Sequence, residues 1–366
     1  MNIVMTCGGT GGHIYPAIAI ADKIREHHED ANIAFIGTGR PLEHEVIPQS
    51  GYELFTLAVK GFTRKELLKN FGVIKVTLKC RRQAKKILKE LMPQAVIGTG
   101  GYVTVPVITA AKSLGIPCFI HEQNAVPGLS NMFLERYCKK VFLGFQEASA
   151  FFKDLEKCIV TGNPIRKNIC ALSKKEAREK LNIGRKDKVL LVFGGSQGAG
   201  MLNKLVIDIL PLLLSKKGVK VIVITGSYYY KAVESDLKEK GILDNKDLSL
   251  IAYTEDIGHY LSACDMALSR AGALTVSEEA ACSVPSILIP SPNVTGNHQF
   301  FNGKSFSDKG GAILLNEDGL TEEYLLKEIE DLLQDDEKRE KMSKAMKESF
   351  VADSAYTIFK NLGLRE

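Results

Sequence analysis

Short apolar runs alternate with helical patterns along the whole chain, and this alternation restricts the fold more than any other feature. Strands that are separated by helices pair in parallel, because each helix carries the chain back across the sheet. The runs that we expect to form strands are Ile3–Thr6, Ile33–Gly37, Ala95–Gly98, Pro117–His121, Lys140–Gly144 and Cys158–Thr161 in the first half, and Val189–Phe193, Val219–Thr225, Leu248–Ala252, Asp265–Ser269, Ser286–Pro290 and Ala312–Leu315 in the second. The pattern therefore predicts an α/β fold with parallel sheets.

The two halves of the chain open in the same way, with a strand-like run, a glycine loop and a helix at Ile3–His13 and again from Val189. A chain of 366 residues also exceeds the size at which a single core stops growing. We therefore expect two Rossmann-like domains, at residues 1–162 and 163–345, with a last helix at about 346–366 that packs back on the first domain. Because open α/β sheets bind ligands at the carboxyl ends of their strands, the parallel sheets should face an interdomain cleft.

The composition is that of a globular protein without a membrane span. Apolar residues make up 45% of the chain and charged residues 25%, and no apolar run is long enough to cross a bilayer. The first residues lack the zones of a signal peptide, so we expect no secretion signal. The 8 cysteines show no zinc-like spacing, which is typical of reduced thiols in the cytosol.

The stretch Ser269–Glu279 combines the end of an apolar run, a glycine turn at Gly272 and a helical pattern. The start of such a helix presents free backbone N–H groups and the positive end of the helix dipole, which suit a diphosphate. Glu278 would then accept hydrogen bonds from the hydroxyls of a ribose. Thr275–Glu278 also fits a capping box, in which Glu278 only satisfies a backbone N–H. Both interpretations stay open from this stretch alone.

Two further glycine loops follow strand-like runs, at Gly8–His13 and Gly98–Tyr102. Either one is explained by a tight turn, and the first has neither the dinucleotide nor the Walker spacing. Together they favour close approach of the backbone to phosphates and sugars. His13 could act as a general base at a helix start, or could only bond the loop backbone. His121–Asn124 is a polar cluster at a strand end, which is typical of a site.

Basic residues gather between Lys60 and Lys89, with apolar residues at helical spacing among them. Such a segment can lie on an anionic membrane, although a solvated helix face would carry the same charges. The residues that we expect at the membrane are Arg64, Lys69, Phe71, Ile74, Lys75, Leu78, Lys79 and Arg82. A second stripe should dock on a core and consists of Cys80, Ala84, Ile87 and Leu91. No aromatic ladder accompanies the charge, so we expect no nucleic-acid partner.

Taken in order, several segments resemble the MurG family of bacterial glycosyltransferases. They are Gly8–His13, Gly98–Tyr102, His121–Gly128, Gly162–Pro164 with Arg166, Gly194–Gly198 and Arg270–Glu278. The resemblance implies a GT-B fold and transfer of N-acetylglucosamine from UDP-GlcNAc to lipid I (undecaprenyl-diphosphate-MurNAc-pentapeptide). The reaction inverts the anomeric centre and forms the β-(1→4) linkage of lipid II, a peptidoglycan precursor. The resemblance also implies a peripheral protein on the anionic cytoplasmic face of the cell membrane, with other cell-wall enzymes as further partners.

The resemblance implies roles for individual residues as well. Donor-binding residues would be Thr10, Gly11, Gly12, Asn124, Arg166, Ser196, Gln197, Gly198, Arg270, Gly272, Ala273, Leu274, Thr275, Glu278, His298 and Gln299. Acceptor-binding residues would be Gly9, Thr10, His13, Gly100, Gly101 and Tyr102. We expect His13 to be the catalytic base, with Glu122 as its rival. No Asp-x-Asp motif follows a candidate strand, so we expect no metal or other cofactor, and helix starts with Arg166 would stabilise the leaving diphosphate.

The sequence departs from the family pattern in two places. Gly39–Glu43 replaces a more usual Gly-Leu-Glu run, which leaves the role of Glu43 open, and Gly303 stands where alanine is usual. Three other functions remain as alternatives. A UDP-sugar epimerase shares the architecture but needs no lipid acceptor, an NAD-dependent oxidoreductase is disfavoured by the loop spacing, and a non-catalytic membrane scaffold is disfavoured by the polar residues of the expected site.

Overall fold

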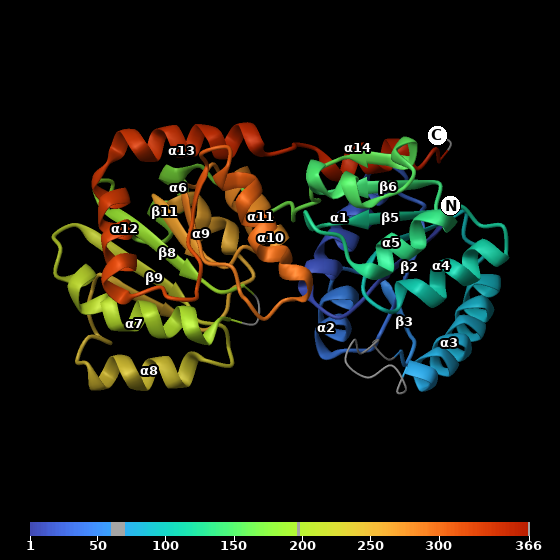
Figure 1. Ribbon diagram of the computed structural model, residues 1–366, viewed down its shortest axis with the longest axis horizontal. Coiled ribbons are helices and arrows are strands. Elements are labelled where there is room, and N and C mark those ends of the chain that lie inside the picture. Colours follow the sequence, from blue (N-terminus) through green and yellow to red (C-terminus); the bar gives the residue numbers. More distant parts are fainter. Residues whose placement is uncertain (60–69, 196–197, 365–366) are drawn as a thin grey trace. The chain divides into compact units, whose positions relative to one another are not determined.

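The computed structural model describes residues 1–59, 70–195 and 198–364, and the chain forms two compact units (Figure 1). The first unit comprises Met1–Arg166 with Asp353–Glu366, and the second comprises Lys167–Ala352. The first unit thus extends past the expected boundary at residue 162, and the C-terminal segment joins it from Asp353, later than expected. The join is later because helix α13, Asp336–Ser349, belongs to the second unit.

A seven-stranded parallel sheet forms the centre of the first unit, in the order β3-β2-β1-β4-β5-β6-β7. Its strands are β1 Asn2–Cys7, β2 Asn32–Gly37, β3 Glu53–Thr56, β4 Ala95–Gly100, β5 Cys118–Glu122, β6 Lys140–Leu143 and β7 Cys158–Val160. The strand order reverses between β1 and β4. The loops that follow these two strands therefore lie at the switch point where open sheets bind ligands.

Both faces of this sheet are buried. In β1, Ile3 and Met5 belong to the core on one face, and Val4 belongs to the core on the other. Strands that are buried on both faces are continuous apolar runs, which is why the sequence pattern detects them. The exception is β3, which we did not predict, because this edge strand is short and its residues are exposed or half-buried.

Helices cover the two faces of the first sheet. They are α1 Gly11–His27, α2 Pro41–Gln49, α3 Asn70–Leu91, α4 Thr104–Ser113 and α5 Leu129–Leu134, with short 3₁₀ turns η2 Glu135–Tyr137, η3 Gln146–Phe151 and η4 Leu155–Lys157. Residues of α1 and α2 pack in one core, and residues of α3, α4 and α5 pack in the other. The expected docking stripe of α3 is confirmed, because Cys80 and Ala84 are buried and Ile87 and Leu91 pack against the same core.

The C-terminal helix α14, Ser354–Asn361, packs on the first unit beside α1, and Figure 1 shows it in red next to the blue and green elements. Ile358 lies in the α1 core. The ring centroids of His27 and Phe359 are 4.6 Å apart. Ser354 Oγ donates to the carbonyl oxygen of Gly162 at 2.8 Å. Apolar, aromatic and polar contacts therefore all hold the helix in place.

The second unit repeats the plan of the first with a six-stranded parallel sheet, in the order β10-β9-β8-β11-β12-β13. Its strands are β8 Lys188–Phe193, β9 Val219–Ile224, β10 Leu248–Ile251, β11 Met266–Ser269, β12 Ser286–Leu288 and β13 Ala312–Leu314. Its helices are α6 Lys174–Lys180, α7 Gly200–Leu214, α8 Tyr230–Glu239, α9 Ile257–Ala263, α10 Ala273–Ala281, the 3₁₀ turn η5 Thr295–Asn297, α11 His298–Ser307, α12 Glu322–Gln334 and α13. Here the strand order reverses between β8 and β11, so α10 begins at the switch point.

Every expected strand is present, with ends that differ by at most two residues from the prediction. No helix in the described ranges 1–59, 70–195 and 198–364 has both the length and the apolar character needed to cross a membrane.

Candidate active site

His13 lies in the first turn of α1, directly after the glycine loop that ends β1. Its Nδ1 is 2.9 Å from the carbonyl oxygen of Gly8. A carbonyl oxygen can only accept a hydrogen bond, so Nδ1 carries the proton and the neutral ring keeps its lone pair on Nε2. Thr99 Oγ1 also donates to the carbonyl oxygen of His13 at 2.7 Å. The ring therefore donates a hydrogen bond to the loop backbone through Nδ1, and Nε2 keeps a lone pair that can accept a proton.

The glycines that follow β4 allow two loops to touch. Gly100 and Gly101 have positive φ angles of 115° and 88°. A Cβ at Gly100 would lie 2.8 Å from the His13 ring, and a Cβ at Gly101 would lie 2.5 Å from the carbonyl oxygen of Gly8. The sequence interpretation assigned these glycines to close approach of a ligand. The packing of the first loop against them already requires glycine at both positions. Gly9 differs, because no described atom lies within 4 Å of a Cβ built there.

Glu122, the expected rival base, has hydrogen-bond donors on both carboxylate oxygens. Oε1 accepts from the backbone N–H of Asn124 at 3.0 Å and from its Nδ2 at 3.1 Å. Oε2 accepts from the backbone N–H of Gly128 at 3.0 Å and from Asn131 Nδ2 at 2.8 Å. A buried carboxylate that accepts four hydrogen bonds holds its loop in shape. All four hydrogen bonds tie this carboxylate to the segment that follows β5.

His121 ties the end of β5 to the end of the first unit. Its Nε2 donates to the carbonyl oxygen of Gly162 at 3.1 Å, and its Nδ1 accepts from Gln123 Nε2 at 2.9 Å. Burial lowers the pKa of His121 to about 4, so the ring is neutral at physiological pH. Asn163 Nδ2 in turn donates to the carbonyl oxygen of Gln123 at 3.0 Å. This cluster supports the site and does not supply its acid or base.

Glu43, whose role the sequence interpretation left open, supports the glycine loop after β1. Its fully buried carboxylate accepts from the backbone N–H of Gly9 at 3.0 Å, from that of Gly39 at 2.8 Å and from the N–H of Thr38 at 2.6 Å. Thr38 Oγ1 adds a fourth bond of 2.6 Å. The carboxylate therefore joins the loops after β1 and β2. An acidic residue beside a run of glycines and threonine is the only signal of this role in the sequence.

The expected donor residues of the first unit lie on several of its loops and helices. Thr10 is the N-cap residue of α1, which begins at Gly11, and Gly12 follows in its first turn. Arg166 ends the first unit, and its guanidinium lies over the ring of Tyr15 at 4.8 Å from the centroid. Tyr102, an expected acceptor contact, is half exposed after β4. These placements bring α1, the β4 loop and residue 166 into one unit.

Helix α10 resolves the ambiguity of the stretch Ser269–Glu279. Gly272 is its N-cap residue, with extended backbone angles, and Thr275 lies inside the first turn. Thr275–Glu278 therefore cannot be a capping box, and that alternative is wrong. Gly272 has no side chain, so the N-cap residue itself supplies no side-chain cap for this helix start. The N–H groups at Ala273 and Leu274 are thus directed at the carboxyl edge of β11, as an anion site requires.

Two adjacent carboxylates in α10 have different surroundings. Glu278 is buried in the second turn. Glu279 is fully buried, and Ser269 Oγ donates to its Oε1 at 2.7 Å. Burial raises the pKa of Glu279 to about 8, so the native protein holds this carboxyl protonated at neutral pH.

The raised pKa of Glu279 predicts a pH dependence of stability. Above its ordinary pKa of 4.5 the unfolded chain releases this proton while the native protein keeps it. The stabilisation is therefore complete below about pH 4.5 and is lost as pH rises through about 8. We expect the free energy of unfolding to fall by a few kcal/mol across this range, and Glu279→Gln to remove that fall. Denaturant unfolding at a series of pH values measures it, and equal slopes for both proteins would contradict the prediction.

The remaining expected donor residues of the second unit lie at the same edge of its sheet. Gly198 has a φ of 75°, and a Cβ there would lie 2.2 Å from the carbonyl oxygen of Thr225. Ser196 and Gln197 lie outside the described residues. Arg270 is buried, donates to the carbonyl oxygen of Ile289 at 3.0 Å and forms an ion pair with Glu317. Arg270 therefore holds the loops after β11 and β12 together.

The start of α11 supplies the last of these residues. His298 Nδ1 is 2.9 Å from the carbonyl oxygen of Thr295, so it carries the ring proton. Gln299 Oε1 accepts from the backbone N–H of Ser291 at 2.8 Å. Gly303 is explained by packing, because a Cβ there would lie 2.7 Å from Leu314 Cδ1. The departure from alanine at this position therefore accompanies a close helix-to-strand contact.

The basic helix α3 is described only in part. Arg64 and Lys69 lie outside the described residues, and so does the side chain of Phe71. Ile74 and Leu78 are 48% and 49% exposed, one turn apart. The neighbouring basic residues Lys75, Lys79 and Arg82 are exposed as well. Within the part of the chain that the structure describes, no three His, Cys, Asp or Glu side chains are grouped so that they could hold a metal ion.

Two family models match the chain. The glycosyltransferase family 28 N-terminal domain matches residues 3–143, and the glycosyltransferase family 28 C-terminal domain matches residues 189–358. A protein of Alkaliphilus metalliredigens (strain QYMF) is 41% identical over 346 residues, 94% of each chain. One of Natranaerobius thermophilus is 38% identical over 365 residues, 99% of each chain. Both are named UDP-N-acetylglucosamine--N-acetylmuramyl-(pentapeptide) pyrophosphoryl-undecaprenol N-acetylglucosamine transferase.

Solved structures agree with these relatives. MurG from Acinetobacter baumannii matches with a TM-score of 0.77 and 25% identity, over 99% of this chain and 98% of that one. UDP-GlcNAc 2-epimerase from Neisseria meningitidis, bound to UDP-GlcNAc, matches with a TM-score of 0.68 and 14% identity over 99% of each chain, which shows the fold alone. The expected resemblance and the GT-B fold are thus confirmed. The chain belongs to glycosyltransferase family 28 and, within it, to the MurG family of N-acetylglucosamine transferases.

Proposed function

We propose that this chain transfers N-acetylglucosamine from UDP-GlcNAc to lipid I and forms the β-(1→4) linkage of lipid II with inversion. One observation carries the proposal for this chain's own residues. The start of α10 lies at the switch point of the second sheet, and the carboxylate of Glu278 follows in the next turn. That arrangement suits a nucleoside diphosphate, with the diphosphate at the helix start and the ribose at Glu278.

The donor diphosphate is the group whose charge must be stabilised. As the bond to the sugar breaks, negative charge builds on the leaving UDP. The dipole of α10 and the N–H groups at Ala273 and Leu274 stabilise that charge, and Arg166 adds a full positive charge. Gly198, Ser196 and Gln197 complete the diphosphate side, while Arg270 acts by holding the loop. In the second unit, His298 and Gln299 are the proposed contacts of the donor sugar. In the first unit, Asn124, Thr10, Gly11 and Gly12 are the proposed donor-binding residues.

The acceptor hydroxyl needs a base. Inversion requires the hydroxyl to attack the anomeric carbon from the face opposite to UDP. His13 Nε2 takes the proton of that hydroxyl, because the bond from Nδ1–H to Gly8 keeps the lone pair on Nε2. Gly9, Gly100, Gly101 and Tyr102 line the acceptor side. Glu122 shapes the neighbouring loop through its four hydrogen bonds.

The acceptor carries a lipid chain, so we propose that the protein lies on the cytoplasmic face of an anionic membrane. Ile74 and Leu78 are half exposed beside Lys75, Lys79 and Arg82 on α3. Apolar side chains that enter the interface and lysines that meet anionic headgroups together give reversible binding.

The double variant Ile74→Glu/Leu78→Glu is expected to lose at least about tenfold in affinity for anionic vesicles, since two apolar contacts are lost and two negative charges are added. Vesicle co-sedimentation measures the affinity. Leu212→Glu on α7, where Leu212 is 55% exposed, is the matched control. Equal losses in both proteins would rule out α3 as the docking surface.

Release of UDP with and without a lipid I analogue tests the proposed reaction. We expect release only when the acceptor is present. Release without acceptor, together with an isomerised UDP-sugar, would instead identify an epimerase, which shares the fold.

A further inference from the structure

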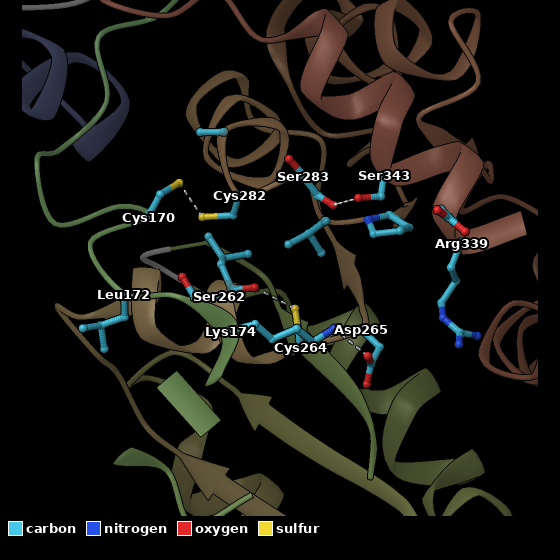
Figure 2. Close-up of a pocket in the computed structure, with 15 residues that line it drawn as sticks. Cys170, Leu172, Lys174, Ser262, Cys264, Asp265, Cys282, Ser283, Arg339 and Ser343 are labelled. Atoms are coloured by element: carbon cyan, nitrogen blue, oxygen red, sulfur yellow. Dashed lines mark hydrogen bonds and ion pairs between the residues drawn. The ribbon is translucent and has the colours of Figure 1, made fainter. Parts of the chain in front are cut away.

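Two cysteines that are distant in the chain meet on the second unit. Cys170 and Cys282 are 112 positions apart, and their Sγ atoms lie 2.8 Å apart (Figure 2). Both are free thiols. The other cysteines are buried, except Cys158, which is partly exposed. No role in sugar transfer uses this pair.

The backbone holds each thiol in place. Cys170 lies in a turn with a φ of 59°, a left-handed angle that is uncommon for a residue with a side chain. Cys282 is the C-cap residue that directly follows α10, and its N–H donates to the carbonyl oxygen of Glu278 at 3.1 Å. The contact therefore joins an unusual turn to a helix end.

A cavity gives small molecules access to the pair. It has a volume of about 400 Å³ and is lined by both cysteines and by Lys174, Asp265 and Arg339 (Figure 2). Asp265 directly precedes β11, so the cavity lies at the amino edge of the sheet, away from the start of α10. The cavity is therefore separate from the proposed donor site.

The two sulfur atoms differ in character. Either thiol can donate the hydrogen bond between the two sulfur atoms, and this contact lowers the pKa of Cys170 and raises that of Cys282. Cys170 is also the exposed member of the pair. Thiolate character and exposure together make Cys170 the attacking sulfur.

We propose that Cys170 and Cys282 form a thiol-oxidation site that reacts with low-molecular-weight disulfides. The Cys170 thiolate attacks one sulfur of the small disulfide, a mixed disulfide forms, and one small thiolate leaves. The Cys282 thiolate then attacks Cys170 Sγ, the intramolecular disulfide forms, and the second small thiolate leaves. The two protein protons pass to the released thiolates through water. One small disulfide is reduced to two thiols as two protein thiols are oxidised to one disulfide.

Oxidation would fasten two segments of the second unit to each other. Cys170 follows the unit boundary at Arg166 and Lys167 by a few residues, and Cys282 directly follows the helix that carries Glu278. The disulfide closes a long loop of the chain, which restricts the unfolded state. We expect the oxidised protein to melt on the order of 5 °C higher than the reduced protein.

The test is incubation of the folded, reduced protein with oxidised glutathione, followed by alkylation and peptide mass mapping without reduction. We expect a Cys170–Cys282 cross-linked peptide that dithiothreitol removes. Cys282→Ser should instead keep glutathione on Cys170, and Cys170→Ser should carry no adduct at Cys282. Cys118 and Cys138, which are buried in one core, serve as an internal control and should stay reduced.

Absence of the cross-linked peptide, with both thiols still alkylated, would overturn the proposal. A stable glutathione adduct on Cys170 of the unmodified chain would also overturn it, because Cys282 would then have failed to attack. Equal oxidation of Cys118 and Cys138 would show general opening of the protein and would contradict a defined site. The result on the unmodified chain decides the proposal even where a serine variant folds poorly.

Discussion

Replacing His13 with alanine is expected to lower kcat about 10²- to 10⁴-fold while the affinity for UDP-GlcNAc stays unchanged. The loss follows from removing the Nε2 lone pair that takes the acceptor proton. The donor affinity is kept because the proposed donor contacts of the second unit, at α10, do not involve this ring. Steady-state kinetics with a lipid I analogue and a separate UDP titration measure the two quantities.

His44→Ala is the matched control for this experiment. His44 is an exposed histidine of the same unit, on α2, and its loss should leave kcat unchanged. Glu122→Gln should have a lower free energy of unfolding than the unmodified protein, because the Glu122 carboxylate accepts four hydrogen bonds. Wild-type turnover in His13→Ala would eliminate this residue as the base.

Replacing Glu278 with alanine is expected to weaken UDP binding at least about 100-fold. Two hydrogen bonds from ribose hydroxyls to a buried carboxylate are lost, and each bond to a charged group contributes roughly 1.5–3 kcal/mol. Calorimetric titration with UDP measures the change directly. The same loss should appear with UDP-GlcNAc as a raised KM.

The neighbouring residue supplies a close control. Glu279→Gln changes the next carboxyl in α10, which is protonated at neutral pH because burial raises its pKa to about 8. A neutral amide should replace a neutral acid there with little effect on UDP affinity at pH 7. Equal weakening by both substitutions would mean that α10 itself is disturbed, and it would contradict a specific contact at Glu278.

The sheets could be predicted because burial of both faces leaves a clear pattern. Strands such as β8, Lys188–Phe193, have apolar residues at successive positions, and parallel pairing follows from the helices between them. β3 escaped prediction because it has no such run.

Local motifs were harder to interpret because one pattern fits several structures. Thr275–Glu278 has the spacing of a capping box, and only the position of Gly272 as the N-cap shows that the helix begins earlier. Gly100 and Gly101 suggested a ligand, although the first loop packs against them. Glu43 supports that loop from helix α2, and the acidic residue beside glycines and threonine is too weak a signal to assign that contact from a single sequence.

The anomeric configuration of the isolated product tests the central claim most directly. Purified protein is incubated with UDP-GlcNAc and a short-chain lipid I analogue, and the glycolipid product is examined by NMR. The proposal predicts a single new β-(1→4)-linked N-acetylglucosamine on the MurNAc residue, formed with one UDP per sugar transferred. An α-linked product, or a UDP-sugar isomerised without transfer, would contradict it.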